Sequence, residues 1–151
     1  MKKICFLLVL FLCPFCVFAI DLASNAKSAI IIEPTTGKII FEKNSNERLE
    51  PASMTKIMTL LLTFEAIDNG RVSLDDMVNI SKRAEDMGGS QMFLEAGSNI
   101  RLEEIIKGVS IASANDGAIA LAEFIGGSVE NFVDMMNKKV EDLGLSNTHF
   151  V

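Results

Sequence analysis

The sequence predicts an α+β domain, in which a β-hairpin is followed by a series of helices. Two isoleucine-rich runs, 28–32 and 38–41, flank a turn with Pro34 and Gly37, and they give the clearest strand signal in the chain. From Ala52 onward the apolar residues recur with helical spacing. Strands followed by helices, without alternation between them, are typical of the α+β class.

The first expected helix begins at Ala52 and ends at Asn69-Gly70, a pair that commonly terminates helices. Few polar residues follow Lys56 in this segment, so we expect the helix to be buried on most sides. Ser128 is a suitable N-cap for the last helix of the chain. The later helices are expected over Arg101–Ile111, Asp116–Ile125 and Val129–Leu143.

The segments between these helices carry weaker signals. Val78–Ile80 is a short extended piece, and Ser81–Asp86 has the length of one helical turn. No segment after the hairpin is expected to supply further strands. A lone hairpin is marginally stable in water, so this hairpin would lack the partner strands that it needs.

The first nineteen residues are expected to be a signal peptide. Lys2 and Lys3 give a basic start, an apolar stretch follows, and Val17-Phe18-Ala19 is typical of a cleavage site. The stretch is short for a stable membrane span, and Pro14 interrupts it. We therefore expect an exported protein with one domain over residues 20–151; a retained N-terminal anchor is the alternative.

Composition excludes several classes of site. The three cysteines, Cys5, Cys13 and Cys16, all lie in the expected leader, so the mature chain would have no disulfide, catalytic thiol or cysteine metal site. Loss of the two leader lysines takes the net charge from −6 to −8, and an acidic chain without a basic cluster is a poor binder of nucleic acid. Because His149 is the only histidine, neither a Ser-His-Asp triad nor a histidine metal site is expected.

Ser53 and Lys56 form the candidate catalytic pair. They stand three positions apart at the start of the apolar helix, a spacing that places both on one face. A neutral lysine amine can then take the proton of the serine hydroxyl. Burial and the positive end of a helix both lower the pKa of an ammonium group, as a general base requires. The alternative is that Ser53 only caps the helix.

The same Ser-x-x-Lys spacing occurs at Ser24 and Lys27. That pair lies in a polar segment that leads into a strand. A strand does not return the fourth residue to the first, so Lys27 is not expected to reach Ser24.

Ser113 and Asn115 form a second candidate element, in the break between two expected helices. Its ordinary interpretation is a helix cap, because Asn115-Asp116 is a favourable helix start. Its functional interpretation is that Ser113 relays a proton and Asn115 holds a substrate amide, both facing Ser53.

The order Ser-x-x-Lys then Ser-x-Asn resembles the motifs of penicillin-binding proteins and serine β-lactamases. The surrounding sequence is similar to the low-molecular-weight D-alanyl-D-alanine carboxypeptidases of the peptidase S11 type, over essentially all of the chain after the leader. The resemblance is carried by Ile32–Lys38, Pro51–Lys56, Met92–Leu94, Lys107–Val109, Ser113–Asp116 and Leu143–Phe150.

This resemblance implies the β-lactamase and penicillin-binding-protein fold, and removal of the terminal D-alanine from peptidoglycan stem peptides through an acyl-enzyme. Ser53 would be the nucleophile and Lys56 the general base. Ser113 would relay a proton to the leaving amine, and Asn115 would bind substrate or orient Lys56. The backbone N–H of Ser53 would donate to the oxyanion.

The resemblance also implies the partners and the location. The partner would be a stem peptide ending in D-Ala-D-Ala, β-lactams would acylate Ser53 as inhibitors, and no metal or organic cofactor would be needed. The protein would act in the periplasm or at the outer face of the cytoplasmic membrane. Membrane association would come from a retained leader or a C-terminal anchor.

The sequence departs from the family in one respect, because the third motif, Lys-Thr-Gly on a sheet strand, is absent. That strand supplies a cation for the substrate carboxylate and the second oxyanion donor, and loss of one such donor costs about a hundred- to a thousand-fold in rate. We therefore expect this chain to be the N-terminal part of such a domain and to be inactive alone. The hairpin edge and one helix face would be left uncovered.

The sequence is also compatible with two other functions. A serine β-lactamase-related hydrolase would turn over a penicillin, whereas a carboxypeptidase would release a stable acyl-enzyme slowly. A non-catalytic exported binding protein would retain the fold without the reaction, and the missing third motif favours it.

Overall fold

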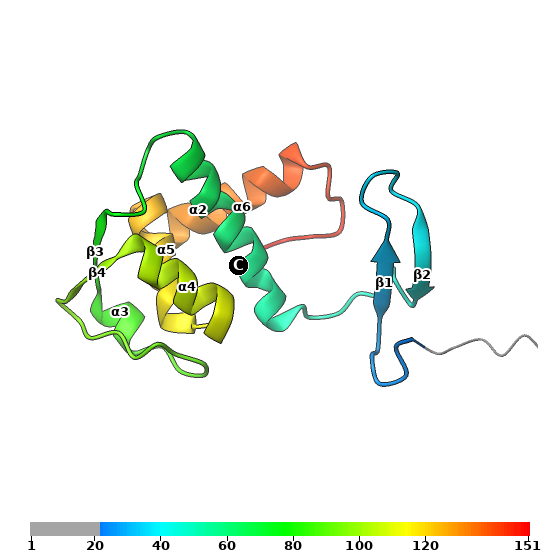
Figure 1. Ribbon diagram of the computed structural model, residues 1–151, viewed down its shortest axis with the longest axis horizontal. Helices are drawn as coiled ribbons and strands as arrows, with labels where there is room; N and C mark the ends of the chain where they lie inside the picture. The colour runs from blue at the N-terminus through cyan, green and yellow to red at the C-terminus, as the bar shows by residue number, and fades with distance from the viewer. Residues whose placement is uncertain (1–21) are drawn as a thin grey trace, which may run out of the picture. The chain divides into compact units, whose positions relative to one another are not determined.

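The computed structural model describes residues 22–151, so the predicted leader lies outside the described residues. The chain divides into two compact units, one that ends at Leu49 and one that spans Glu50–Val151 (Figure 1). Across residues 22–151, no helix is long and apolar enough to cross a membrane.

The first unit is an antiparallel hairpin of β1 (Ala29–Ile32) and β2 (Ile39–Lys43), as the sequence predicted. None of the residues from 22 to 49 is buried. Even the isoleucines are 43–62% exposed. The hairpin is therefore held by its ladder, its turn and side-chain hydrogen bonds to backbone carbonyls rather than by a core, and its apolar side chains are exposed. The exposed isoleucines are Ile30, Ile31, Ile32, Ile39 and Ile40.

The second unit is mostly helical, and its helices lie within a few residues of the predicted ranges. Ser81 and Ser128 cap α3 and α6, because their side chains accept hydrogen bonds from backbone N–H groups three residues ahead. The elements are η1 (Ala52–Thr55), α2 (Lys56–Asp68), β3 (Met77–Asn79), α3 (Lys82–Glu85), β4 (Asn99–Arg101), α4 (Leu102–Ala112), α5 (Asn115–Gly126) and α6 (Val129–Asp142).

The structure corrects the prediction that no strand follows the hairpin. β3 pairs with β4 in a second antiparallel sheet, separate from the hairpin sheet. The extended piece at Val78 was predicted, but its partner strand was not. β4 is three residues long and has a single apolar residue, Ile100, so it leaves almost no alternating pattern to detect.

The expected burial of α2 on most sides is wrong, whereas the expected uncovered helix face is present. Ile57, Leu61 and Phe64 are 68%, 37% and 46% exposed, so one apolar face of the helix is open in this unit. The apolar composition of the helix could not distinguish a buried face from an apolar face without a neighbour. The opposite face is buried through Met58 and Leu62.

Two apolar clusters form the core of the second unit, and α5 contributes to both. Leu121 belongs to the cluster with residues of α4 and β3, whereas Ile125 belongs to the cluster with residues of α2 and α6. α5 accordingly packs against α2, α3, α4 and α6 (Figure 1). The N-terminus of α5 is thereby fixed in position next to the start of α2.

Candidate active site

Ser53 and Lys56 lie where the sequence predicted, at the junction of η1 and α2. Ser53 is in the 3-10 turn and Lys56 is the first residue of the α-helix. The Lys56 Nζ donates a hydrogen bond to the Ser53 Oγ at 3.3 Å. The two side chains therefore share one face, as the three-residue spacing requires.

The backbone directly before the serine is strained. Ala52 has φ +47°, a left-handed conformation that a residue with a Cβ rarely adopts. Strain of this kind costs about 1–3 kcal/mol and clusters at functional sites. The strained turn allows the chain to enter the helix with the Ser53 hydroxyl facing the Lys56 amine.

Asn115 completes the arrangement from a distant part of the chain. The Lys56 Nζ donates to the Asn115 Oδ1 at 2.7 Å. The Asn115 Nδ2 donates to the carbonyl of Gly88 at 2.7 Å, so the oxygen of the amide is the atom that faces the lysine. The backbone N–H of Asn115 donates to the carbonyl of Ser90, also at 2.7 Å.

Asn115-Asp116 does begin a helix, as the ordinary interpretation predicted, but neither residue is its N-cap. Ala114 is the N-cap residue of α5, and among the described residues it has no side-chain capping hydrogen bond. The Asp116 carboxylate accepts from the N–H of Gly117 in the first turn, whereas the Asn115 side chain serves no N–H group of that turn. Both side chains also bind residues between Gly88 and Leu94, outside the helix.

The electrostatics of Lys56 suit a base. Its side chain is partly buried, and that burial lowers the pKa of the ammonium group below its usual value. Within residues 22–151 no carboxylate forms an ion pair with Lys56, so no ion pair stabilises its protonated form. A lysine amine with a lowered pKa gives up its proton more readily and can accept one from a serine.

Ser113 lies in the turn that connects α4 to α5. It is the C-cap residue of α4, with φ +56°, and its side chain is partly buried. In the described part of the chain no hydrogen bond joins the Ser113 hydroxyl to Ser53 or Lys56. The structure thus joins three of the four predicted residues directly and places the fourth two residues before Asn115.

Ser24 and Lys27 behave differently from the pair on α2. Ser24 lies in a turn and Lys27 in a bend before β1. The carbonyl of Ser24 accepts from the Lys43 Nζ at 3.3 Å, and no hydrogen bond joins Ser24 to Lys27 in the hairpin unit as described. The prediction that this lysine does not return to its serine agrees with the structure.

Sequence reasoning missed the role of Asp116, which it considered only as a cap. Its side chain is 1% exposed. The carboxylate accepts hydrogen bonds from the backbone N–H groups of Met92 and Leu94 at 3.1 Å and from that of Gly117 at 2.8 Å. The available signal was a charged residue directly after Ser-x-Asn, at the start of a mostly apolar helix.

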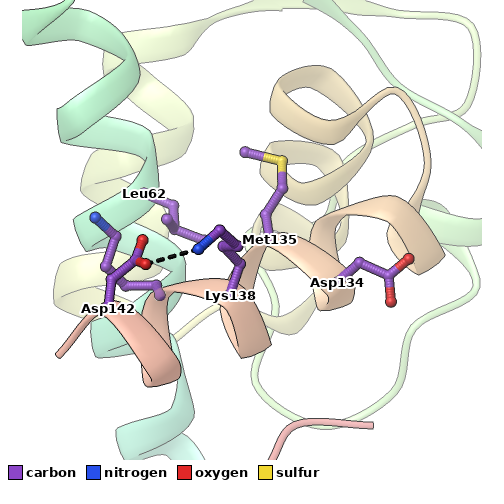
Figure 2. A pocket seen from close by; sticks show the side chains of 6 residues that line it. Leu62, Asp134, Met135, Lys138 and Asp142 are labelled. Atoms are coloured by element: carbon purple, nitrogen blue, oxygen red, sulfur yellow. Dashed lines mark hydrogen bonds and ion pairs between the residues drawn. The ribbon is translucent and has the colours of Figure 1, made fainter. Parts of the chain in front are cut away.

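A hollow of about 440 Å³ lies elsewhere, beside α6 (Figure 2). The Lys138 Nζ donates to the Asp142 Oδ1 at its edge, at 2.8 Å. No candidate site residue lines it. Across residues 22–151 no group of three or more His, Cys, Asp or Glu side chains could hold a metal ion. The residues that line the hollow are Leu62, Asp134, Met135, Lys138, Lys139 and Asp142.

Comparison with known proteins matches this arrangement to a family. The family model Peptidase S11, described as D-alanyl-D-alanine carboxypeptidase, matches residues 18–151. The D-alanyl-D-alanine carboxypeptidase DacF of Bacillus subtilis is 57% identical over 130 residues, which are 86% of this chain and 33% of that protein. The D-alanyl-D-alanine carboxypeptidase DacC of Escherichia coli is 39% identical, over 83% of this chain and 33% of its own.

Solved structures give the same result. The D-alanyl-D-alanine carboxypeptidase DacD of Francisella tularensis is 40% identical, with a TM-score of 0.81 over 84% of this chain and 31% of its own. Penicillin binding protein 5 of Haemophilus influenzae is 36% identical, with a TM-score of 0.79 over 83% of this chain and 38% of its own. The predicted fold is confirmed. The chain spans about a third of the length of the curated relatives it matches.

Proposed function

The chain belongs to the D-alanyl-D-alanine carboxypeptidase family, peptidase S11, and from that membership we propose that it carries the nucleophile and the base of a serine-type carboxypeptidase. The substrate is a peptidoglycan stem peptide that ends in D-Ala-D-Ala. The reaction removes the terminal D-alanine through an acyl-enzyme. β-Lactams react with the same serine and inhibit it.

One observation supports this proposal most directly. The Lys56 Nζ lies between the Ser53 Oγ, at 3.3 Å, and the Asn115 Oδ1, at 2.7 Å, and burial lowers its pKa. A serine beside a lysine of lowered pKa is an activated nucleophile that needs no histidine. The site as described therefore matches the chemistry of the family.

In the first proposed step the Ser53 Oγ attacks the carbonyl carbon of the bond between the two D-alanines. The Ser53 proton passes to the Lys56 Nζ, and the carbonyl oxygen becomes an oxyanion near the N-terminus of α2. Asn115 keeps an acceptor beside the amine throughout, so the lysine does not turn away when it gains the proton.

In the second step the tetrahedral intermediate collapses. The carbon–nitrogen bond breaks, the leaving amine of D-alanine takes a proton that Ser113 relays from Lys56, and Ser53 remains as an ester. Lys56, neutral again, then accepts a proton from water, and the resulting hydroxide attacks the ester carbonyl. Ser53 regains its proton and the shortened stem peptide leaves. The proposed location is outside the cytoplasm, in the periplasm or at the outer face of the cytoplasmic membrane.

A chimera tests the proposal. The matching third of the B. subtilis relative is replaced by residues 22–151 of this chain, and release of D-alanine from a peptide ending in D-Ala-D-Ala is measured. We expect the chimera to release D-alanine, and we expect Ser53→Ala to lower the rate of release by about a thousand-fold or more. Ser24→Ala is the matched control, because it removes the serine of the other Ser-x-x-Lys pair, and it should retain activity.

Three results would count against the proposal or a part of it. Full activity of Ser53→Ala would exclude Ser53 as the nucleophile. Rapid turnover of a penicillin by the active chimera would instead favour a β-lactamase-like hydrolase. Labelling of Ser53 by a fluorescent penicillin in the 151-residue chain alone would overturn the expectation that this chain is inactive by itself.

A further inference from the structure

Asp116 is a buried carboxylate that the reaction above does not use. It is 1% exposed, and in the part of the chain that the structure describes it has no cationic partner. A buried charge without a counterion is costly unless hydrogen bonds compensate it. Here backbone N–H groups supply that compensation, and two of them, from Met92 and Leu94, belong to a segment more than twenty residues away.

That segment, residues 88–94, is bound to the start of α5 at four positions. The carbonyls of Gly88 and Ser90 accept from the side chain and the backbone of Asn115. The N–H groups of Met92 and Leu94 donate to Asp116. Two adjacent residues of α5 therefore hold the whole 88–94 segment.

Phe93, which lies between the two donors to the carboxylate, has a strained backbone. Phe93 has φ +60° and is 83% exposed, so no packing of its own ring explains this left-handed conformation. The N–H groups on both sides of it point to the same carboxylate. Asp116 can therefore supply the interaction that maintains the strain.

The position of the segment decides which atom of Asn115 faces Lys56. The carbonyl of Gly88 accepts from the Asn115 Nδ2, which leaves the Oδ1 for the lysine amine. Without that carbonyl only the hydrogen bond from Lys56 would orient the amide, and a half-rotation would present N–H groups to an amine that needs an acceptor. The Gly88 carbonyl stays in place only while the segment is held.

We propose that Asp116 is a positioning residue, which holds the 88–94 segment so that the Asn115 amide keeps its oxygen toward Lys56. The inference rests on the proposed function of the Ser53 and Lys56 pair. Asp116 itself touches neither reacting group, and it acts through Gly88 and Asn115.

Hydrogen exchange in the 151-residue chain tests the first link. In Asp116→Asn one side-chain oxygen is replaced by an N–H donor. Because Met92 donates to both oxygens, that donor faces the N–H of Met92 in either orientation of the amide, and it also faces the N–H of Leu94 or Gly117. We expect the backbone amides of these two residues and the side-chain amide of Asn115 to exchange about tenfold faster, while amides of α6 are unchanged. Asp134→Asn removes the same charge from an exposed position and should change none of them.

Two further variants separate positioning from stability. Val140→Ala creates a small cavity in the core between α6 and α2. It should accelerate the exchange of many amides together, and that of the Asn115 side-chain amide no more than the others. In Gly89→Ala the new methyl carbon would lie 2.7 Å from the Asn115 Nδ2. Gly89 also has φ +81°, so the alanine strains the backbone of the 88–94 segment. This variant should make the Asn115 side-chain amide exchange about tenfold faster, and accelerate it more than the backbone amides of Met92 and Leu94.

The proposal is wrong if Asp116→Asn frees Met92 and Leu94 but leaves the Asn115 side chain protected, or if all amides accelerate together as in Val140→Ala. If Asp116→Asn does not fold, an unchanged Asn115 amide in Gly89→Ala overturns the proposal instead. In the chimera, Asp116→Asn should slow labelling by a fluorescent penicillin about tenfold. A chimera that never labels refutes the proposed function, whereas the exchange result stands independently.

Discussion

Ser24 and Lys27 precede the hairpin with the same spacing that separates Ser53 from Lys56 at the start of α2. In the first pair the serine lies in a turn, and its lysine does not reach it. In the second pair one turn of helix brings the amine to 3.3 Å from the hydroxyl. The spacing is thus productive only where the backbone is helical, and a third residue, Asn115, holds the amine there.

The two regions also differ in what supports them. The described residues up to Leu49 include none that is buried, whereas α2 packs through Met58 and Leu62 against α5 and α6. A hairpin held by hydrogen bonds without a core can change conformation without disturbing a core. Ser53 and Lys56 are held in place because α2 is held in place. The distance between their side chains should therefore depend on the packing of α2 against α5 and α6.

The largest effect is expected from Phe132→Ala. Phe132 is 1% exposed in the cluster that includes Met58 and Leu62 of α2. Removing it should lower the free energy of unfolding by about 3–5 kcal/mol. Urea unfolding followed by far-UV circular dichroism measures this. Ile31→Ala in the hairpin is the control and should change the value by less than about 0.5 kcal/mol. Equal losses of unfolding free energy in Phe132→Ala and Ile31→Ala would contradict the difference in support between the helical unit and the hairpin.

A smaller effect is expected from Ser128→Ala. The Ser128 side chain accepts from the backbone N–H of Asn131 at 3.1 Å and so caps α6, which supports α2. Its loss should cost about 1 kcal/mol in the same unfolding experiment. Ser110→Ala, an exposed serine within α4, is the matched control. If both variants unfold at the same urea concentration as the parent chain, capping of α6 does not contribute to the support of α2.

The smallest effect concerns pH and Lys56 itself. Burial lowers its folded-state pKa below the usual 10.5, so between these two values the unfolded chain binds more protons and stability rises with pH. Relative to Lys56→Gln, the parent chain should gain stability between pH 7 and 10, modestly because solvent screens a partly exposed amine. Urea unfolding at several pH values measures the difference.

Lys107→Gln is the control for the pH experiment. Hydrogen bonds and ion pairs with Glu103 and Glu104 raise the pKa of Lys107. Its contribution is therefore fully present below the unfolded pKa and should stay constant over the same range. If the stability difference between the parent chain and Lys56→Gln is equally constant, or falls as the pH rises, the lowered pKa of Lys56 is contradicted.

The sequence predicted the features that depend on neighbours along the chain. The hairpin, the helix ranges and the contact of Ser53 with Lys56 all follow from local spacing. The position of Asn115 beside Lys56 needed the family resemblance, because 59 residues separate the two. The role of Asp116 and the strand β4 were not predicted, since both depend on pairing between distant segments that leaves no periodic pattern.

Met92 shows how little room remains behind the site. A Cβ added at Gly117 would lie 2.9 Å from the Cγ2 of Val109 and 3.3 Å from the Met92 sulfur, and one added at Gly108 would also collide with that sulfur. Filling the junction of α4 and α5 with larger residues is therefore not a route to a more robust protein.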